Sequence, residues 1–97
     1  MAHELIWSEE ALEDIDSIAT YIEKDSSVYA KAVVSKVFEK VEMLKDFSQM
    51  GRIVPELNQD NLRELFIYSY RLIYKISNNT ILIIAVIHGK RLIESQN

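Results

Sequence analysis

The spacing of apolar residues changes once along this chain, and the change sets its fold class. Up to Leu44, apolar residues recur every three or four positions, in two stretches that follow Ser8 and Ser26 or Ser27. This spacing is typical of amphipathic helices, and serine is a preferred N-terminal cap. After Pro55 the apolar residues alternate with polar ones or form unbroken runs, as in strands. The pattern predicts an antiparallel helical hairpin packed on a sheet.

Three strands are expected after the helices and one before them. Leu62–Ile67 and Tyr70–Ile76 have strand-like spacing, and Ile81–Ile87 is a run of seven apolar residues. That run is too short to span a membrane and fits a strand buried on both faces in the middle of the sheet. His3–Ile6 is the expected edge strand. The predicted fold is α+β, in the order β-α-α-β-β-β: an N-terminal edge strand and a helical hairpin on a small antiparallel sheet, in one domain spanning residues 1–97.

Two turns are expected from residue type. The segment Ser77–Thr80 contains two asparagines, which tolerate positive φ, and predicts a hairpin turn between the last two strands. Gly51 interrupts the pattern after the second helix. It is expected to adopt a backbone conformation that other residues avoid.

Charge is distributed unevenly between the two halves of the chain. The formal net charge is −4, but all four arginines lie in the second half: Arg52, Arg63, Arg71 and Arg91. A sequence-independent nucleic-acid binder usually has a much larger basic excess, so that class is disfavoured, whereas a local anion site is compatible with the pattern. The chain has no cysteine and no basic segment followed by an apolar stretch at its start. We therefore expect a cytoplasmic protein without disulfides, a signal peptide or a membrane partner.

Arg71 is the first candidate functional residue. Strand alternation places Arg71 with Ile73 and Lys75 on the face opposite the helices, where a guanidinium can hold a phosphate or carboxylate. The structural alternative is an ion pair with Glu64 or Glu56, and that alternative is favoured because exposed strand arginines usually contribute little.

The end of the last strand holds the other candidates. His88 could donate or accept a proton near neutral pH, or simply end the strand with a hydrogen bond. Lys90 and Arg91 could complete an anion site with Arg71 or form a solvated tail. Metal binding is disfavoured because His3 and His88 are the only histidines, and no metal-ligand motif or glycine-rich phosphate loop occurs. No cofactor is therefore expected.

Five segments, in order and at suitable intervals, resemble the RelE/ParE superfamily of bacterial toxins, often labelled plasmid stabilisation proteins. The segments are "WSEEALEDIDSIATYI", "GRIVPEL", "LRELFI", "YRLIY" and "VIHGKR". Together they cover nearly the whole chain. The resemblance implies a helical hairpin on a small antiparallel sheet, and a toxin that is neutralised by a cognate antitoxin.

The superfamily has two biochemical branches. Its RelE-like members are metal-independent, ribosome-dependent mRNA endonucleases, and its ParE-like members inhibit DNA gyrase by binding it. By resemblance, Arg71 matches the arginine at the scissile phosphate of the nucleases and Arg91 matches a second phosphate-stabilising arginine. Arg63 falls near a basic strand position, and Glu56 matches an acid that serves some members as general base. An endonuclease would therefore use Glu56, Arg71, His88 and Arg91.

Departures from the nuclease pattern favour the ParE-like branch. The tail "LIESQN" has no aromatic residue, and His88 stands in the "H-G-x-R" form of the ParE branch. Leu65 occupies a place where RelE has a strand lysine. The sequence therefore predicts a gyrase-binding toxin whose functional face comprises Arg63, Arg71, His88, Lys90 and Arg91. The alternatives are an endonuclease acting on mRNA at the ribosome, or an inactive relic that only binds antitoxin, and the toxin could form a homodimer or a hetero-oligomer with its antitoxin.

Overall fold

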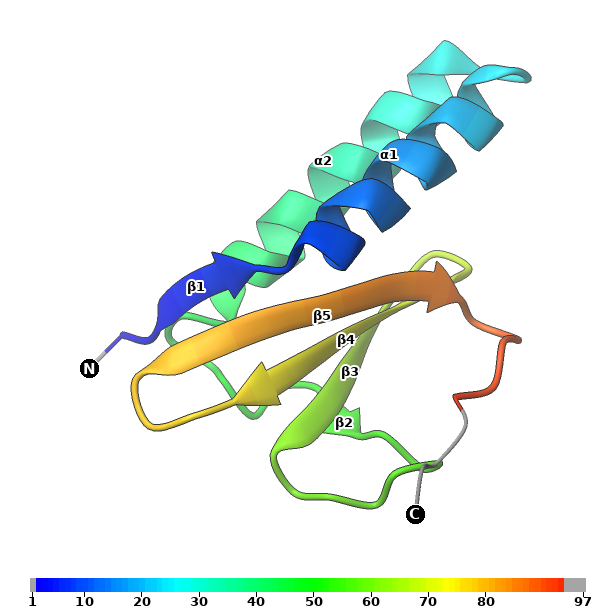
Figure 1. The fold of residues 1–97 in the computed structure, drawn as a ribbon. Coiled ribbons are helices and arrows are strands. Elements are labelled where there is room, and N and C mark those ends of the chain that lie inside the picture. Colours follow the sequence, from blue (N-terminus) through cyan, green and yellow to red (C-terminus); the bar gives the residue numbers. More distant parts are fainter. Residues whose placement is uncertain (1, 94–97) are drawn as a thin grey trace.

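The computed structural model describes residues 2–93, which form two helices and one five-stranded sheet (Figure 1). The helices lie side by side across one face of the sheet, and the other face is not covered by a helix. The strand order is β1-β5-β4-β3-β2. The elements are β1 (Glu4–Trp7), α1 (Glu9–Glu23), α2 (Ser27–Met43), β2 (Arg52–Ile53), β3 (Leu62–Ile67), β4 (Tyr70–Ile76) and β5 (Thr80–His88).

Both helices begin at the serines that the sequence indicated. The Ala11 amide donates to Ser8 Oγ at 3.0 Å, and the Tyr29 amide donates to Ser26 Oγ at 3.0 Å. Each serine thereby satisfies a backbone donor that has no partner within the first turn of its helix. The buried faces of the helices pack on the sheet in a main apolar core that includes Leu72, Tyr74, Ile81 and Ile83. A smaller cluster of Ile22, Ala30 and Val33 joins the two helices.

The predicted α+β class and order of elements are confirmed, and the structure refines the sheet in two ways. The N-terminal strand runs parallel to β5, with Leu5 opposite Ile81, whereas the other pairs are antiparallel, so the sheet is mixed. The two-residue β2 adds a further edge strand beside β3. As predicted, β5 is an interior strand, between β1 and β4.

The first helix protects the part of β5 that β1 does not reach. Pairing with β1 ends at Ile83, which leaves the backbone of the following residues without a strand partner on that side. Ser8 Oγ donates to the Ile84 carbonyl at 2.9 Å, and the Val86 amide donates to Asp14 Oδ2 at 2.9 Å. The start of α1 thus satisfies backbone groups that would otherwise form an unprotected sheet edge.

The backbone conformation expected of Gly51 is wrong, but the glycine is required for another reason. No glycine among the described residues has a positive φ. A Cβ on Gly51 would instead lie 2.5 Å from the Glu64 carbonyl oxygen and 2.7 Å from the Tyr74 hydroxyl. The Gly51 amide donates to that hydroxyl at 3.0 Å, and the hydroxyl donates to the Ser48 carbonyl at 2.7 Å. The chain must approach β3 and β4 closely here, and only glycine leaves room.

The expected hairpin turn at Ser77–Thr80 joins β4 to β5, and the Ser77 amide donates to the Thr80 carbonyl at 2.9 Å. Its asparagines do not use positive φ. Among the described non-glycine residues, positive φ occurs at Asn58 and at Tyr68, which lies between β3 and β4. Within residues 2–93, no helix is both long and apolar enough to cross a membrane.

We predict that Tyr74→Phe lowers the free energy of unfolding by about 1–3 kcal/mol, because it leaves the buried Gly51 amide and the Ser48 carbonyl without their partner. Urea denaturation would measure the loss. Tyr68→Phe is the control, because Tyr68 is 54% exposed, and it should change stability by less than about 0.5 kcal/mol. Equal losses in the two variants would contradict the role assigned to the Tyr74 hydroxyl.

Candidate functional site

Arg71 lies in the middle of the sheet, on the face away from the helices. Its neighbours Leu72 and Tyr74 belong to the core beneath the helices, so strand alternation directs Arg71 to the opposite side. The predicted face is therefore correct. However, only 4% of the side chain is exposed, because two acidic residues and the C-terminal segment surround the guanidinium.

Glu56 and Glu64 both pair with the Arg71 guanidinium. The two terminal nitrogens of Arg71 donate to the two Glu56 carboxylate oxygens at 2.7 and 2.8 Å, which is a bidentate arrangement. Arg71 Nε donates to Glu64 Oε1 at 2.8 Å, and Nη2 lies 2.6 Å from the same oxygen. The structural alternative of an ion pair is thus the arrangement found, with both acids rather than one.

The register of the sheet explains how Glu64 reaches Arg71. Phe66 of β3 is directly opposite Arg71, and Glu64 lies two residues along the same strand, hence on the same face and diagonal to Arg71. Glu56 arrives from the loop that follows β2 and Pro55. A strand neighbour and a loop residue therefore converge on one guanidinium.

A second arginine extends the cluster to the surface. Arg52 Nε donates to the other Glu64 oxygen, Oε2, at 2.5 Å, and the Arg52 guanidinium carbon lies 4.9 Å from the centre of the Phe66 ring. The Glu64 side chain is fully buried, whereas the Arg52 side chain is 59% exposed. Two arginines and two glutamates thus form one neutral chain of charges, in the order Arg52, Glu64, Arg71 and Glu56.

These contacts decide the protonation states. Hydrogen bonds from Arg71 lower the pKa of Glu56 from 4.5 to about 2, despite the opposing effect of partial burial. The Glu56 carboxylate is also the main cause of a raised pKa for Arg71, to which Glu64 contributes. At neutral pH Glu56 is a weak base with both oxygens occupied, so proton abstraction by this carboxylate is unfavourable.

Arg63, also placed on the functional face by the sequence, clamps a loop. Its Nε and Nη2 donate to the Asp60 carbonyl and carboxylate, each at 3.0 Å. Nη1 donates to the Gly51 carbonyl at 2.9 Å. Only 13% of the Arg63 side chain is exposed. The residue therefore holds the segment before β2 against the start of β3.

The remaining candidates, His88, Lys90 and Arg91, are exposed at the end of β5. His88 Nδ1 accepts a hydrogen bond from the Lys90 amide at 3.2 Å, and the imidazole meets the Tyr70 ring edge-on, with centroids 5.9 Å apart. Arg91 reaches the buried cluster through its backbone, because its carbonyl accepts from Arg71 Nη1 at 2.8 Å. Arg71, Glu56 and the Arg91 carbonyl therefore converge, while the cations of Lys90 and Arg91 are available to solvent.

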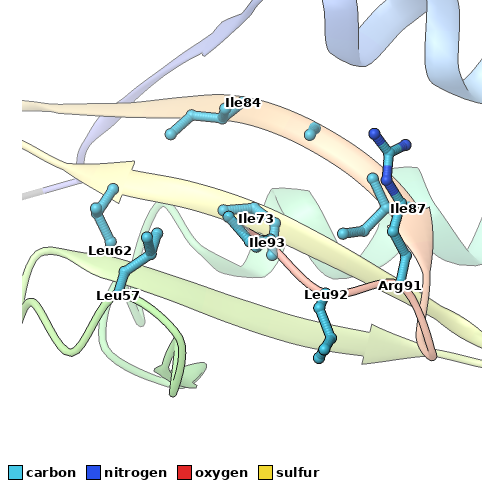
Figure 2. A pocket seen from close by; sticks show the side chains of 9 residues that line it. Leu57, Leu62, Ile73, Ile84, Ile87, Arg91, Leu92 and Ile93 are labelled. Atoms are coloured by element: carbon cyan, nitrogen blue, oxygen red, sulfur yellow. The ribbon is translucent and has the colours of Figure 1, made fainter. Parts of the chain in front are cut away.

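An apolar groove that the sequence did not predict lies beside this cluster. The groove has a volume of about 530 Å³ and lies on the sheet face away from the helices (Figure 2). Its lining residues are Leu57, Leu62, Ile73, Ile84, Ala85, Ile87, Arg91, Leu92 and Ile93. The three lining residues from β5, Ile84, Ala85 and Ile87, belong to the run without polar alternation that predicted burial on both faces, and the structure leaves them partly exposed instead. No group of His, Asp or Glu within residues 2–93 is arranged to hold a metal ion.

Comparison with known proteins gives the family. Residues 5–93 match the family model described as ParE toxin of type II toxin–antitoxin system, parDE. The chain belongs to the ParE toxin family. No protein of curated function matches it.

Solved structures agree with this ParE fold. The chromosomal ParDE TA system from P. aeruginosa superimposes with a TM-score of 0.74 at 20% identity, over 92% of this chain and 98% of that chain. The YoeB dimer from Staphylococcus aureus gives a TM-score of 0.62 at 19% identity, and the YoeB-YefM complex from the same organism gives 0.57 at 19%. Each YoeB match covers 91% of this chain and 98% of the other. At these identities the likeness establishes the fold alone.

In this ParE-family chain, Arg71→Ala should lower the free energy of unfolding by about 3–5 kcal/mol, because it leaves two carboxylates of one buried cluster without their shared cation. Arg52→Ala also removes a cation from Glu64 but at an exposed position, and should cost about 1 kcal/mol or less. Urea denaturation of both variants would compare them. Similar losses would show that Arg71 does not hold the cluster together.

Acid should weaken the contribution of Glu56. Because the folded-state pKa lies below its ordinary value, the carboxylate stabilises the fold above about pH 4.5, and this contribution is lost as the pH falls towards about 2. The difference in melting temperature between wild type and Glu56→Gln should therefore shrink over that interval. Asp60→Asn, in an ion pair whose carboxylate side chain is 81% exposed, is the control and should differ little from wild type. A wild-type advantage over Glu56→Gln that stays constant from pH 7 to 2 would contradict the prediction.

Proposed function

We propose that this protein is the toxin of a type II toxin–antitoxin system, and that it acts by binding and inhibiting DNA gyrase. The observation that carries the proposal is the match of residues 5–93 to the ParE family. The mode of action would be binding rather than chemistry, and the site would be in the cytoplasm, where gyrase works.

The chemistry of the arginine cluster supports binding over RNA cleavage. A metal-independent nuclease needs a group that removes the proton from the attacking hydroxyl and free cations that stabilise the phosphate. Both Glu56 oxygens are bonded to Arg71, and Arg71 is itself buried and engaged by Glu64. Neither residue presents a free functional group to a substrate, so of the four residues that an endonuclease would use, His88 and Arg91 are the two that are exposed.

The exposed cations at the end of β5 are the proposed contact with the target. Lys90 and Arg91 are consecutive in the chain just after the end of β5 at His88, and all three residues are exposed. Arg63 and Arg71 would support this surface from within, as residues that fix the loops and the sheet. This assignment divides the five predicted face residues into three that touch the partner and two that hold the framework.

A cognate antitoxin is the second proposed partner. The similar structures include a ParDE system and a YoeB-YefM complex, in which the toxin is accompanied by its antitoxin. By that likeness, we expect this chain to be held inactive in a hetero-oligomer, through an antitoxin segment that orders on binding. A homodimer of the free toxin is also compatible with the likeness to the YoeB dimer.

The test uses purified protein free of antitoxin in two parallel assays. One follows supercoiling of plasmid DNA by gyrase and the appearance of linear DNA, and the other follows mRNA cleavage on translating ribosomes. We expect gyrase-dependent linear DNA and intact mRNA. Cleavage of mRNA with unaffected gyrase would overturn the proposal in favour of a RelE-like endonuclease, and no effect in either assay would indicate an inactive relic.

A pair of variants tests the contact surface. Lys90→Ala combined with Arg91→Ala should weaken gyrase inhibition on the order of tenfold, since an interface arginine commonly contributes more than about 1 kcal/mol. Lys24→Ala combined with Lys31→Ala removes the same charge from exposed positions around the helical hairpin, and should retain full inhibition. Equal inhibition by the two double variants would exclude the end of β5 as the contact.

A further inference from the structure

The last described segment of the chain, Arg91–Ile93, returns over the open face of the sheet; we call it the C-terminal strap. Strand β5 ends at His88, and a turn at Gly89 and Lys90 reverses the chain. The Gly89 amide donates to the Ser69 carbonyl at 2.7 Å, which fixes the end of the strand. Figure 2 shows the strap running back beside Ile73, with the side chains of Arg91 and Leu92 pointing to opposite sides.

Besides the turn bond from the Arg91 amide to the His88 carbonyl at 3.0 Å, two hydrogen bonds tie the strap to the sheet, and both of these end on the same ion pair. Arg71 Nη1 donates to the Arg91 carbonyl at 2.8 Å, and the Ile93 amide donates to Glu56 Oε2 at 3.0 Å. Bonds to charged groups are stronger than those between neutral groups. The Arg71–Glu56 pair therefore acts on the strap from both sides, as a donor and as an acceptor.

The strap closes one side of the apolar groove. Leu92 and Ile93 line it together with Ile73, Ile84 and Ile87 of the sheet. Without the strap these strand side chains would face water on the side of the sheet that no helix covers. Part of the apolar surface of β4 and β5 is thus protected by three residues and one ion pair.

The strap can leave without disturbing the fold beneath it. Arg71 keeps its bonds to both glutamates when the Arg91 carbonyl departs, so the buried charges stay paired. Leu92 is 76% exposed and contributes little burial. The strap is not part of a strand, so within residues 2–93 its opening about the turn breaks the two hydrogen bonds to the ion pair and no strand pairing. Such a segment is expected to open locally at a lower free energy than global unfolding.

We propose that the C-terminal strap is a cover on the apolar groove, held shut by the Arg71–Glu56 pair as a latch and able to open while the sheet stays folded. The turn at Gly89 and Lys90 is the hinge. The low pKa of Glu56 keeps its carboxylate charged not only at neutral pH but also below the ordinary pKa of a glutamate. The inference does not depend on gyrase being the target.

Hydrogen exchange of single amides, followed by NMR on the whole chain, tests the cover. The Ile93 amide of the wild type should be protected, but should exchange at least tenfold faster than the Gly89 amide, whose partner Ser69 lies outside the latch. The proposal is wrong if Ile93 exchanges only at the rate of global unfolding measured in urea, or if it shows no protection at all.

A variant of the latch gives a second, independent test. Glu56→Gln should lower the protection of the Ile93 amide on the order of tenfold, because the hydrogen bond to a charged acceptor is lost. The protection of the Gly89 amide should be unchanged. It should also raise the fluorescence of 1-anilinonaphthalene-8-sulfonate, a dye that binds exposed apolar surface. Asp60→Asn is the control, because it removes the exposed carboxylate that pairs with Arg63 without touching the strap. Equal behaviour of the two variants, or equal loss of protection at Ile93 and Gly89 in Glu56→Gln, would overturn the latch.

Discussion

The sheet face away from the helices depends on the ion pairs of the buried Arg71 guanidinium. A charge at 4% exposure is tolerated only when it is paired and its donors are occupied, and here two carboxylates and a backbone carbonyl meet that requirement. The cluster joins β3, β4, the loop after β2 and the C-terminal strap. Elements distant in sequence are thus held together without a second layer of helices.

Polar side chains also satisfy unpaired groups on the helical side of the sheet, where they replace missing backbone hydrogen-bond partners. Ser8 caps α1 and also donates to Ile84, and Asp14 accepts from Val86. The first helix therefore serves both as the cover of the core and as the protection of the edge of β5. The short N-terminal strand suffices because the helix that follows it completes the edge.

These contacts decide which arginines are free to bind a partner. The resemblance predicts a phosphate contact for Arg71 and places Arg63 near a basic strand position, yet both side chains are engaged within the protein. Substituting Arg71 would therefore test stability before it tested binding. Among the residues predicted for the functional face, the cations exposed to a partner are Lys90 and Arg91, beyond the end of β5. Exposed cations next to arginines that are already paired agree with the proposed toxin that acts by binding its target. Substituting Lys90 and Arg91 would test this binding without removing a buried ion pair.

The sequence by itself determined the local structure, because caps, turns and hydrophobic periods act over a few residues. It indicated both helix starts, the hairpin turn at Ser77–Thr80 and the interior position of β5, and it placed Arg71 on the correct face. It also identified both possible acidic partners of Arg71. Only the tertiary structure decided that Glu56 and Glu64 bind at the same time, because one arrives by strand register and the other by the path of a loop.

Other features depended on long-range packing in the same way. The parallel direction of β1 follows from its pairing with a strand more than seventy residues away, which no local pattern specifies. Gly51 is needed because the Tyr74 ring and the β3 backbone lie against it, rather than for its own backbone angles. The strap and its groove likewise arise where the end of the chain meets the sheet. Short-range interactions within the sequence determine the helices and strands, whereas tertiary packing decides which charged side chains remain exposed.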